Sequence, residues 1–470
     1  QRPSRVAEDT YDRLREQAAI QVRGRGITPP LFEIVDHTQL ALLPPRSPMD
    51  VWFDMEGDPY APGQHGLEYM FGYGFLHSGE FDFDTFEAHN ATQEREAFEG
   101  FINEVMRRRH ADPGMHVYHY ANYEQRALKR LAQQYGTRER EIDLLLKEGR
   151  LVDLYRIVQR ALRFSTESLS LKYIEAVYGV THSDEDVSTA MQSVIQYQEY
   201  QALIADGNIN EADRILEAIR SYNKLDCEST MELDSWLRTL SEAPTDRAGD
   251  GAPTGDSEDT EDADQIGPAD PHLDLVLALE ADVPSDPDQR SPQEHAQALL
   301  AAALQYHERE RRPAWWKLFD LITAEPEELE RASDVLLITE ATASDWHKTP
   351  RMKKHRRDMT LLSESEDPRL VLDAAAKVFL LYDPAPDGMA TPSDSLRGYN
   401  SAETSHMTET SVEVSERAGR DDAMWADAPI AVLPGQPYNT TPIQNAIAEA
   451  ARSVLPESND GVWRFPDAAW

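Results

Sequence analysis

Two carboxylates stand two residues apart at the end of a short apolar run. Asp54 and Glu56 close the segment VWFDME, and the Gly57-Asp58-Pro59 that follows favours a turn. In a β-strand, residues i and i+2 project to the same face, so these two side chains would point together. Such close like charges raise each other's pKa unless a cation neutralises them, and Mg²⁺ or Mn²⁺ accepts oxygen ligands of this kind. The alternative is a solvated strand end, because D-x-E is common by chance.

Acidic and phenolic side chains recur at two later positions. A strand is expected to end near Tyr120 in HVYHYANYEQRAL, and Glu124 follows in the first turn of the next helix. Glu124 is either a third metal ligand or a carboxylate that complements the helix dipole. Tyr222 and Asp226, in SYNKLDCEST, are four residues apart and therefore share one helix face. Taken alone, this pair favours a tyrosine packed beside a surface aspartate.

The segments that must position these residues predict an α/β domain over residues 48–240. DVWFDME predicts a strand, and 66–79 with 80–90 predict a hairpin. Residues 91–110 predict a helix with Thr92 as its N-cap. GMHVYHYA predicts another strand, and the helix after it is expected to end at Gly136. Three strands, a helix, a strand and further helices fit the order of a ribonuclease H-like fold, with a mixed sheet flanked by helices.

The rest of the chain has a different composition from this domain. Residues 1–47 predict a helical lead-in and a Pro-rich connector. Residues 242–271 contain ten acids and one base among Gly, Pro, Ser and Thr, so we expect an acidic disordered linker over 241–291. Residues 292–340 predict a small, mainly helical connector. Residues 341–470 show no defined pattern and are expected to be partly disordered.

The composition of the chain limits the kinds of partner that it can bind. The net charge of −39, from 46 Lys+Arg against 85 Asp+Glu, argues against a nucleic-acid partner. The charge is segregated, however, because residues 101–172 hold 14 Lys+Arg against 9 Asp+Glu. This basic stretch is either a surface that faces nucleic acid or a set of solvated helix faces. A single cysteine excludes a disulfide framework, and no apolar run reaches the roughly 20 residues needed to span a bilayer. We therefore expect a cytoplasmic protein without a membrane partner.

The acidic motifs also resemble a known family. The motif order resembles that of the DEDD exonucleases, which have a ribonuclease H-like fold: a D-x-E motif on a strand, an acid at a strand-to-helix junction and a Y-x-x-x-D motif on a helix. The tyrosine of the last motif resembles the DEDDy branch of these enzymes. The chain is similar to the YprB-type ribonuclease H-like domain of RecB-like nuclease–helicase fusion proteins. The segments that carry this similarity are DVWFDMEGDPY, GLEYMFGYG, HVYHYANYEQRALKRLA, RLVDLYRIVQRAL, SLSLKYIEAVYG and SYNKLDCEST. ALQYHERERRPAWWKLFDLI resembles the segment that leads to the helicase in such proteins.

The resemblance implies a metal-dependent 3′–5′ exonuclease. Its substrates would be single-stranded 3′ ends, of DNA more than of RNA, in DNA repair or recombination. The implied metal ligands are Asp54, Glu56, Glu124 and Asp226, which would hold two divalent ions, Mg²⁺ or Mn²⁺. Tyr222 would position the attacking water. The candidate nucleic-acid contacts beside these motifs are Tyr123, Arg126, Lys129 and Lys172.

Two departures from the family pattern leave alternatives open. Glu124 stands where the family usually has Asp, and Asp153 is a rival ligand that we expect instead to cap a helix or orient a neighbour. The chain has no G-x-x-x-x-G-K-[ST] motif, so we expect the middle of such a fusion, as a fragment or a split gene. A superfamily 1 helicase and a RecB-like nuclease would then be separate partners or lost by truncation. The alternatives are an inactive module that binds nucleic acid or docks a helicase, and an endonuclease or transposase-like nuclease.

Overall fold

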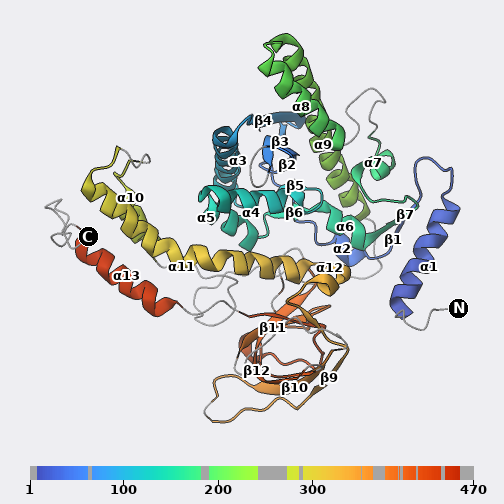
Figure 1. The fold of residues 1–470 in the computed structure, drawn as a ribbon. Coiled ribbons are helices and arrows are strands. Elements are labelled where there is room, and N and C mark those ends of the chain that lie inside the picture. The colour runs from blue at the N-terminus through green and yellow to red at the C-terminus, as the bar shows by residue number, and fades with distance from the viewer. Residues whose placement is uncertain are drawn as a thin grey trace. The chain divides into compact units, whose positions relative to one another are not determined.

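The computed structural model describes residues 8–61, 66–180, 190–241, 272–284, 289–350, 352–363, 376–389, 391, 395–408, 411–435 and 440–455. The chain divides into two compact units, Gln1–Pro253 and Thr254–Trp470 (Figure 1). Each unit packs around hydrophobic clusters drawn from its own strands and helices.

A five-stranded mixed sheet forms the centre of the first unit, in the order β4-β3-β2-β5-β6. β4, β3 and β2 pair antiparallel, whereas β5 and β6 run parallel to β2. The strands are β2 (Val51–Asp58), β3 (Leu67–His77), β4 (Glu80–Glu87), β5 (Val117–His119) and β6 (Leu151–Asp153). A separate antiparallel pair consists of β1 (Phe32–Ile34) and β7 (Leu162–Phe164). The mixed sheet flanked by helices that the sequence predicts is confirmed, and β6 is a fifth strand that was not predicted from the sequence.

Helices connect and cover these strands. They are α1 (Glu8–Arg23), α2 (His37–Leu40), α3 (Ala91–Ala111), α4 (Tyr123–Tyr135), α5 (Glu139–Lys147), α6 (Leu154–Ala161), α7 (Leu171–Ile174), α8 (Ala190–Ala205) and α9 (Ile209–Ser241), with a 3₁₀ turn at Glu175–Val177. Gly136 ends α4 at φ 59°, as predicted. The N-cap of α3 is Asn90 rather than Thr92, because the Asn90 side chain accepts hydrogen bonds from the next two free amides, those of Thr92 and Gln93.

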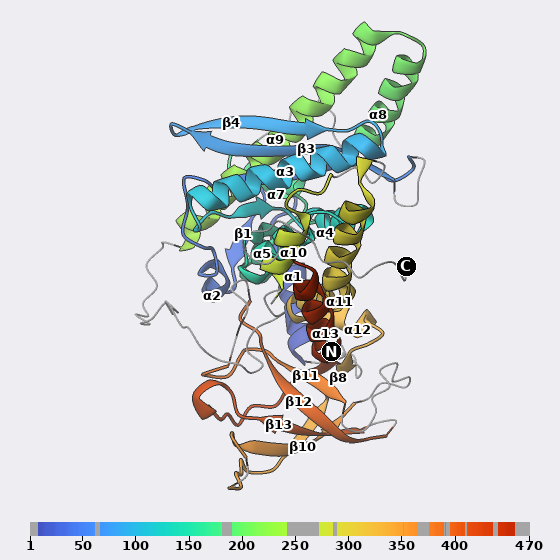
Figure 2. The same ribbon diagram turned by 90° about the vertical axis from the view of Figure 1, so that its left-hand side faces the viewer.

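The two faces of the sheet bury different chemistry, because side chains alternate along β2. On one face, the Phe53 ring stacks on Phe101 of α3 at 4.0 Å between centroids. On the other face, Asp54 meets α9, where Asn223 donates to it. Helices α3 and α9 therefore lie on opposite faces of the sheet, and Figure 2 shows α3 running along β3 and β4. One face packs apolar side chains against α3, and the other holds the acidic residues beside apolar ones such as Trp52, which packs with Leu233 and Leu237 of α9.

α8 and α9 form a long antiparallel helical pair that extends beyond the sheet in both views (Figures 1 and 2). α8 is attached to the sheet by ring stacking of Tyr197 on Tyr69 of β3, with 3.7 Å between centroids. The middle of α9 packs across β2 and β3 through the buried residues Asn223 and Cys227. This packing brings the middle of α9 to the acidic face of the sheet.

The second unit contains a seven-stranded antiparallel sheet in the order β8-β14-β11-β12-β13-β10-β9. Its strands are β8 (Leu336–Leu337), β9 (Glu340–Ala343), β10 (Arg356–Leu362), β11 (Lys377–Tyr382), β12 (Gly398–Met407), β13 (Ser411–Arg417) and β14 (Ala431–Pro434). Its helices are α10 (Leu273–Glu280), α11 (Pro292–Thr323), α12 (Pro326–Arg331) and α13 (Thr441–Val454), with a 3₁₀ turn at Arg420–Asp422. Trp315 of α11 packs on Phe379 of β11 in a buried hydrophobic cluster.

The sequence shows no defined pattern over residues 341–470, where the structure places most strands of this sheet. The outward side chains of β13 are polar: in Ser411–Arg417, Val412 and Val414 are buried between exposed or partly exposed neighbours. Buried Arg357 and Glu416 place charges in the core as well, which obscures the apolar periodicity. The linker expected over 241–291 also contains α10, with Val276 and Leu279 buried, whereas residues 242–271 lie outside the described part of the chain.

Candidate metal centre and active site

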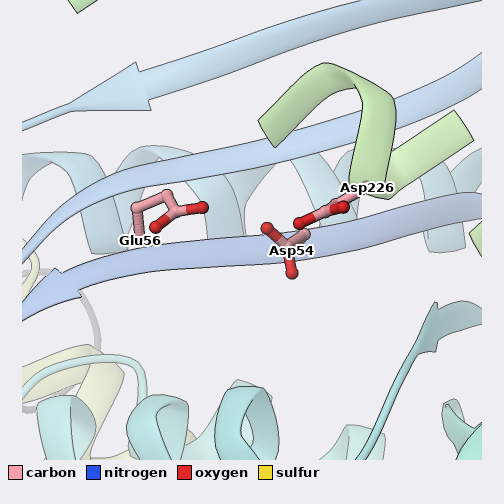
Figure 3. A group of neighbouring side chains, drawn as sticks. All are labelled: Asp54, Glu56 and Asp226. Carbon is pink, nitrogen blue, oxygen red and sulfur yellow. The ribbon is translucent and has the colours of Figure 1, made fainter. Parts of the chain in front are cut away.

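Three carboxylates meet on the acidic face of the first unit's sheet. Asp54 and Glu56 project from β2 and Asp226 from α9, with one oxygen of each within 4.8 Å of the others. Figure 3 shows Asp226 on its helix directed toward Asp54 on the strand, with Glu56 farther along that strand. The period of two along the strand and the crossing of α9 thus bring together residues 170 positions apart. Glu56 is buried, and the other two are partly exposed.

Gly72 explains how α9 comes this close. It pairs with Asp54 across β2 and β3. A Cβ at Gly72 would collide with the side-chain oxygen of Asn223, so a larger residue would displace the helix. The Asn223 Nδ2 instead donates to Asp54 Oδ2 at 2.6 Å and fixes the orientation of that carboxylate.

Glu56 is held by a different helix. Ser193 Oγ of α8 donates to Glu56 Oε2 at 2.7 Å, and the same hydroxyl contacts the phenol of Tyr69. Burial raises the pKa of Glu56 to about 8, against the hydrogen bond from Ser193, and the charge of Asp226 adds to the rise. In the protein without a cation, this carboxyl therefore carries a proton over much of the neutral range.

The electrostatics of the cluster favour a bound cation. Burial raises the pKa of Asp54 well above its ordinary value, and the charges of Asp226, Glu56 and Glu124 raise it further. A hard divalent cation coordinated by carboxylate oxygens removes that repulsion. Three oxygen donors that converge from two elements match the chemistry that Mg²⁺ or Mn²⁺ requires. The residues present therefore fit the metal that the motifs predict.

Glu124 lies at the start of α4, near the cluster but outside the group of three. Its charge contributes to the raised pKa of Asp54. Its Oε2 lies 3.6 Å from Nδ1 of His119, whose own contact is a 2.7 Å hydrogen bond to the backbone oxygen of Ala121. Within the described residues, this buried Oε2 accepts no hydrogen bond, so it retains a lone pair for a ligand. Ala121, at φ 72°, makes the turn that places Glu124 here.

Asp153 is the N-cap of α6. Its Oδ1 accepts hydrogen bonds from the backbone amide of Tyr155 at 3.0 Å and from that of Ala121 at 2.8 Å. The same carboxylate lies 3.5 Å from Arg156. Asp153 thus orients the β5–α4 turn that carries Glu124, in line with the capping and orienting role expected for it.

Tyr222 and Lys172 lie at the edge of the cluster. Tyr222 is buried, and burial together with the charges of Asp226 and Glu56 raises the pKa of its phenol. The Nζ of Lys172 lies 4.9 Å from the centre of the Tyr222 ring, and its charge lowers the pKa of Glu56. A protonated phenol and an ammonium group therefore lie beside three carboxylates.

The other candidate nucleic-acid contacts, all on α4, differ in exposure. Tyr123 is 49% exposed, and its hydroxyl donates to Glu68 at 2.8 Å, which fixes the ring. Arg126 is exposed. Lys129 is only 7% exposed, because the helical turn rotates it toward the core, and this position disfavours a direct phosphate contact.

Comparison with known protein families agrees with this geometry. Residues 51–238 match a family model of the RNase H superfamily, in agreement with the RNase H-like fold of this segment. A search of curated proteins gives no match. An RNase H-like domain that carries an acidic cluster suited to a divalent cation supports nuclease-type hydrolysis and implies contact with nucleic acid. Among the helices that the structure describes, none is long and apolar enough to cross a membrane.

Sequence reasoning missed the residues that hold the carboxylates in place. Asn223 directly follows Tyr222, and its position on the helix face of Asp226 is a signal that could have found it. Gly72 and the residues that contact Glu56 and Glu124, Ser193 and His119, have no such signal. Their roles depend on tertiary contacts such as that between Ser193 and Glu56, 137 residues apart.

Proposed function

We propose that the RNase H-like domain is a metal-dependent 3′–5′ exonuclease that hydrolyses phosphodiester bonds at single-stranded ends, of DNA more than of RNA. The observation that carries this proposal is the convergence of Asp54, Glu56 and Asp226 within 4.8 Å. The exonuclease polarity and a role in DNA repair or recombination rest on the motif resemblance, as does a helicase or RecB-like nuclease as a partner.

The carboxylates would act by holding two divalent cations, Mg²⁺ or Mn²⁺, with Glu124 as the fourth ligand. When bound, such cations lower the pKa of a coordinated water and offset negative charge on the phosphoryl group. Asn223 keeps the Asp54 carboxylate oriented through its 2.6 Å hydrogen bond, and Ser193 does the same for Glu56.

Two side chains would contact the reacting groups directly. The raised pKa of Tyr222 keeps its phenol protonated, so the hydroxyl can donate a hydrogen bond that orients the attacking water. The Lys172 ammonium, beside the Tyr222 ring, can bind a phosphate oxygen of the terminal nucleotide. The exposed ring of Tyr123, fixed by Glu68, offers a surface on which a terminal base can stack.

The test is cleavage of a single strand labelled at one end, in Mn²⁺. A 5′ label should give a ladder that shortens from the 3′ end, and a 3′ label should be released first. D54N and D226N should abolish both patterns and keep the circular dichroism spectrum. The matched control D82N removes an exposed carboxylate from β4 and should cleave normally. Unchanged cleavage by D54N would refute the proposal, and nicking of a circular single strand would indicate an endonuclease.

A second candidate function is a module that binds nucleic acid without cleaving it, or that docks a helicase. It is favoured by the position of Glu124, which lies beside His119 and outside the group of three carboxylates. Titration calorimetry with Mn²⁺ separates the two functions. The exonuclease is favoured if the wild type binds two Mn²⁺ ions and cleaves the strand, and if D226N does neither. Nucleic-acid binding without metal binding or cleavage favours the module.

A further inference from the structure

The second unit carries a concentration of positive charge that the nuclease site does not use. We call residues 346–357, WHKTPRMKKHRR, the basic loop; it joins β9 to β10 and includes the first residues of β10. It contains six Lys+Arg and no acid, in a chain whose net charge is −39. Three of the nine lysines of the whole chain lie within its residues 348–354. Because the rest of the chain is so acidic, this concentration of positive charge indicates a specific role for the basic loop.

The base of the basic loop is firmly anchored on the sheet. Trp346 Nε1 donates to the backbone oxygen of Trp425 at 2.8 Å, and the guanidinium of buried Arg357 lies 4.9 Å from the centre of the Trp346 ring. His347 and Arg356 exchange two backbone hydrogen bonds of 2.8 and 2.9 Å. This anchoring presents the loop's side chains at a defined place on the sheet.

The lysines of the loop face solvent at least in part. Lys353 is exposed and Lys354 is partly exposed. Lys348, 35% exposed, lies 3.1 Å from Asp422, which also accepts a hydrogen bond from His355. One carboxylate is thus shared by two basic groups of the loop. The acids Asp345 and Asp358 flank the loop and lie outside it.

A neighbouring strand adds a further cation. Arg356 of β10 is paired directly with Arg417 of β13, so both side chains project from the same face of the sheet. Like charges in this arrangement destabilise a sheet, and a shared anion reverses the effect. The nearest carboxylate recorded for Arg356 belongs to Glu403, at 3.9 Å, a distance too long for a hydrogen bond. The pair therefore extends the positive surface of the loop.

We propose that the basic loop, with Arg417, is a second nucleic-acid contact that binds the phosphate backbone without regard to sequence. Lysine and arginine side chains grouped on one surface neutralise successive phosphates, and this electrostatic contribution dominates sequence-independent binding. In a chain of net charge −39, a polyanion needs such a local positive surface. A second contact in the same chain raises the affinity for long strands by effective concentration. The inference does not require the first unit to be catalytic.

The test uses the full chain and a fluorescein-labelled single strand. Anisotropy gives the dissociation constant at several salt concentrations, in EDTA so that no cleavage intervenes. The loop variant is K348Q/K353Q/K354Q. The matched control R15Q/R95Q/R214Q removes three charges from exposed helix surfaces of the first unit. A third variant, K348R/K353R/K354R, keeps the loop charge.

For the loop variant, the slope of log affinity against log salt should fall in magnitude by about 2, since each lost single-strand phosphate contact contributes roughly 0.7. The loop variant should therefore bind about 100-fold more weakly at 0.1 M salt than the wild type. The control should change affinity less than about twofold, and the arginine variant should bind like the wild type. Equal weakening by the loop variant and the control would overturn the proposal, because only net charge would matter.

Unchanged binding by the loop variant would overturn it as well. Tighter binding of the single strand by the loop variant would also overturn the proposal. It would indicate that the basic loop binds the chain's own acidic segment 242–271 instead of nucleic acid. In that case, deletion of residues 245–268 should tighten binding of the wild type and leave the loop variant unchanged. None of these outcomes depends on cleavage, so failure here is distinguishable from failure of the proposed exonuclease.

Discussion

Replacing Glu56 by glutamine should stabilise the metal-free first unit at alkaline pH. The pKa of Glu56 is raised from 4.5 to about 8 by burial, so the folded protein retains a proton that the unfolded chain releases. The stability from this group is therefore complete below pH 4.5 and is lost as the pH rises through about 8. Since a tenfold change in proton affinity is worth about 1.4 kcal/mol, the loss is on the order of 5 kcal/mol.

E56Q cannot ionise and should not undergo this loss. We expect E56Q and the wild type to have similar free energies of unfolding at pH 5. At pH 9, E56Q should be more stable than the wild type by several kcal/mol. The changed hydrogen bond from Ser193 should reduce that advantage by about 1 kcal/mol. Hydrogen exchange of β2 and β3 amides in EDTA reports the unfolding of this unit alone. E80Q, which alters an exposed glutamate of β4, is the control and should follow the wild type.

Saturating Mn²⁺ should reverse the order of stability. A ligand that binds only the folded state stabilises it, so the wild type should gain much more than E56Q, which lacks one ligand oxygen. If the free energies of unfolding of E56Q and the wild type instead change in parallel with pH in EDTA, the pKa of Glu56 is not raised in the folded protein. If Mn²⁺ stabilises both equally, Glu56 is not a metal ligand.

Three substitutions test the supporting structure. G72A should destabilise the first unit by about 1–3 kcal/mol and weaken Mn²⁺ binding, because its Cβ collides with Asn223; thermal unfolding and calorimetry measure both effects. N223A should lower cleavage or metal affinity by about 10–100-fold while the circular dichroism spectrum stays unchanged, and full activity would show that the 2.6 Å hydrogen bond is dispensable. R357M should destabilise the second unit by about 3–5 kcal/mol, because it leaves Glu416 buried without its 2.7 Å partner, and R357M/E416L should recover most of that loss in urea unfolding.

The sequence predicts those parts of the site that depend on local periodicity. Asp54 and Glu56 share a face because strands have a period of two, and Gly136 ends its helix because glycine adopts positive φ readily. The meeting of β2 with α9 is not local. It depends on the absence of a side chain at Gly72 and on α9 crossing the sheet at that point, and neither is encoded near Asp226.

The sheet of the second unit could not be predicted for a related reason. Strands β10 and β13 carry mainly polar residues on the outward face, and their inward face includes a buried polar network. The Arg357 guanidinium donates to Glu416 and also to the hydroxyl of Tyr382, at 3.1 Å. A charged residue in a sequence pattern suggests solvent, whereas here each charge is neutralised by a partner distant in the chain. Only the tertiary pairing makes these residues core residues.

The two units bury charge in opposite ways, and this difference supports the functional assignment. In the second unit, Glu416 is joined to Arg357 by a 2.7 Å ion pair, which makes the buried network nearly neutral. In the first unit, the carboxyl groups of Asp54, Glu56 and Asp226 converge within 4.8 Å, and the hydrogen bonds that orient Asp54 and Glu56 come from the neutral side chains of Asn223 and Ser193. Burial of like charges destabilises a fold, so an arrangement that fixes them this firmly is explained by a cation bound in the working protein.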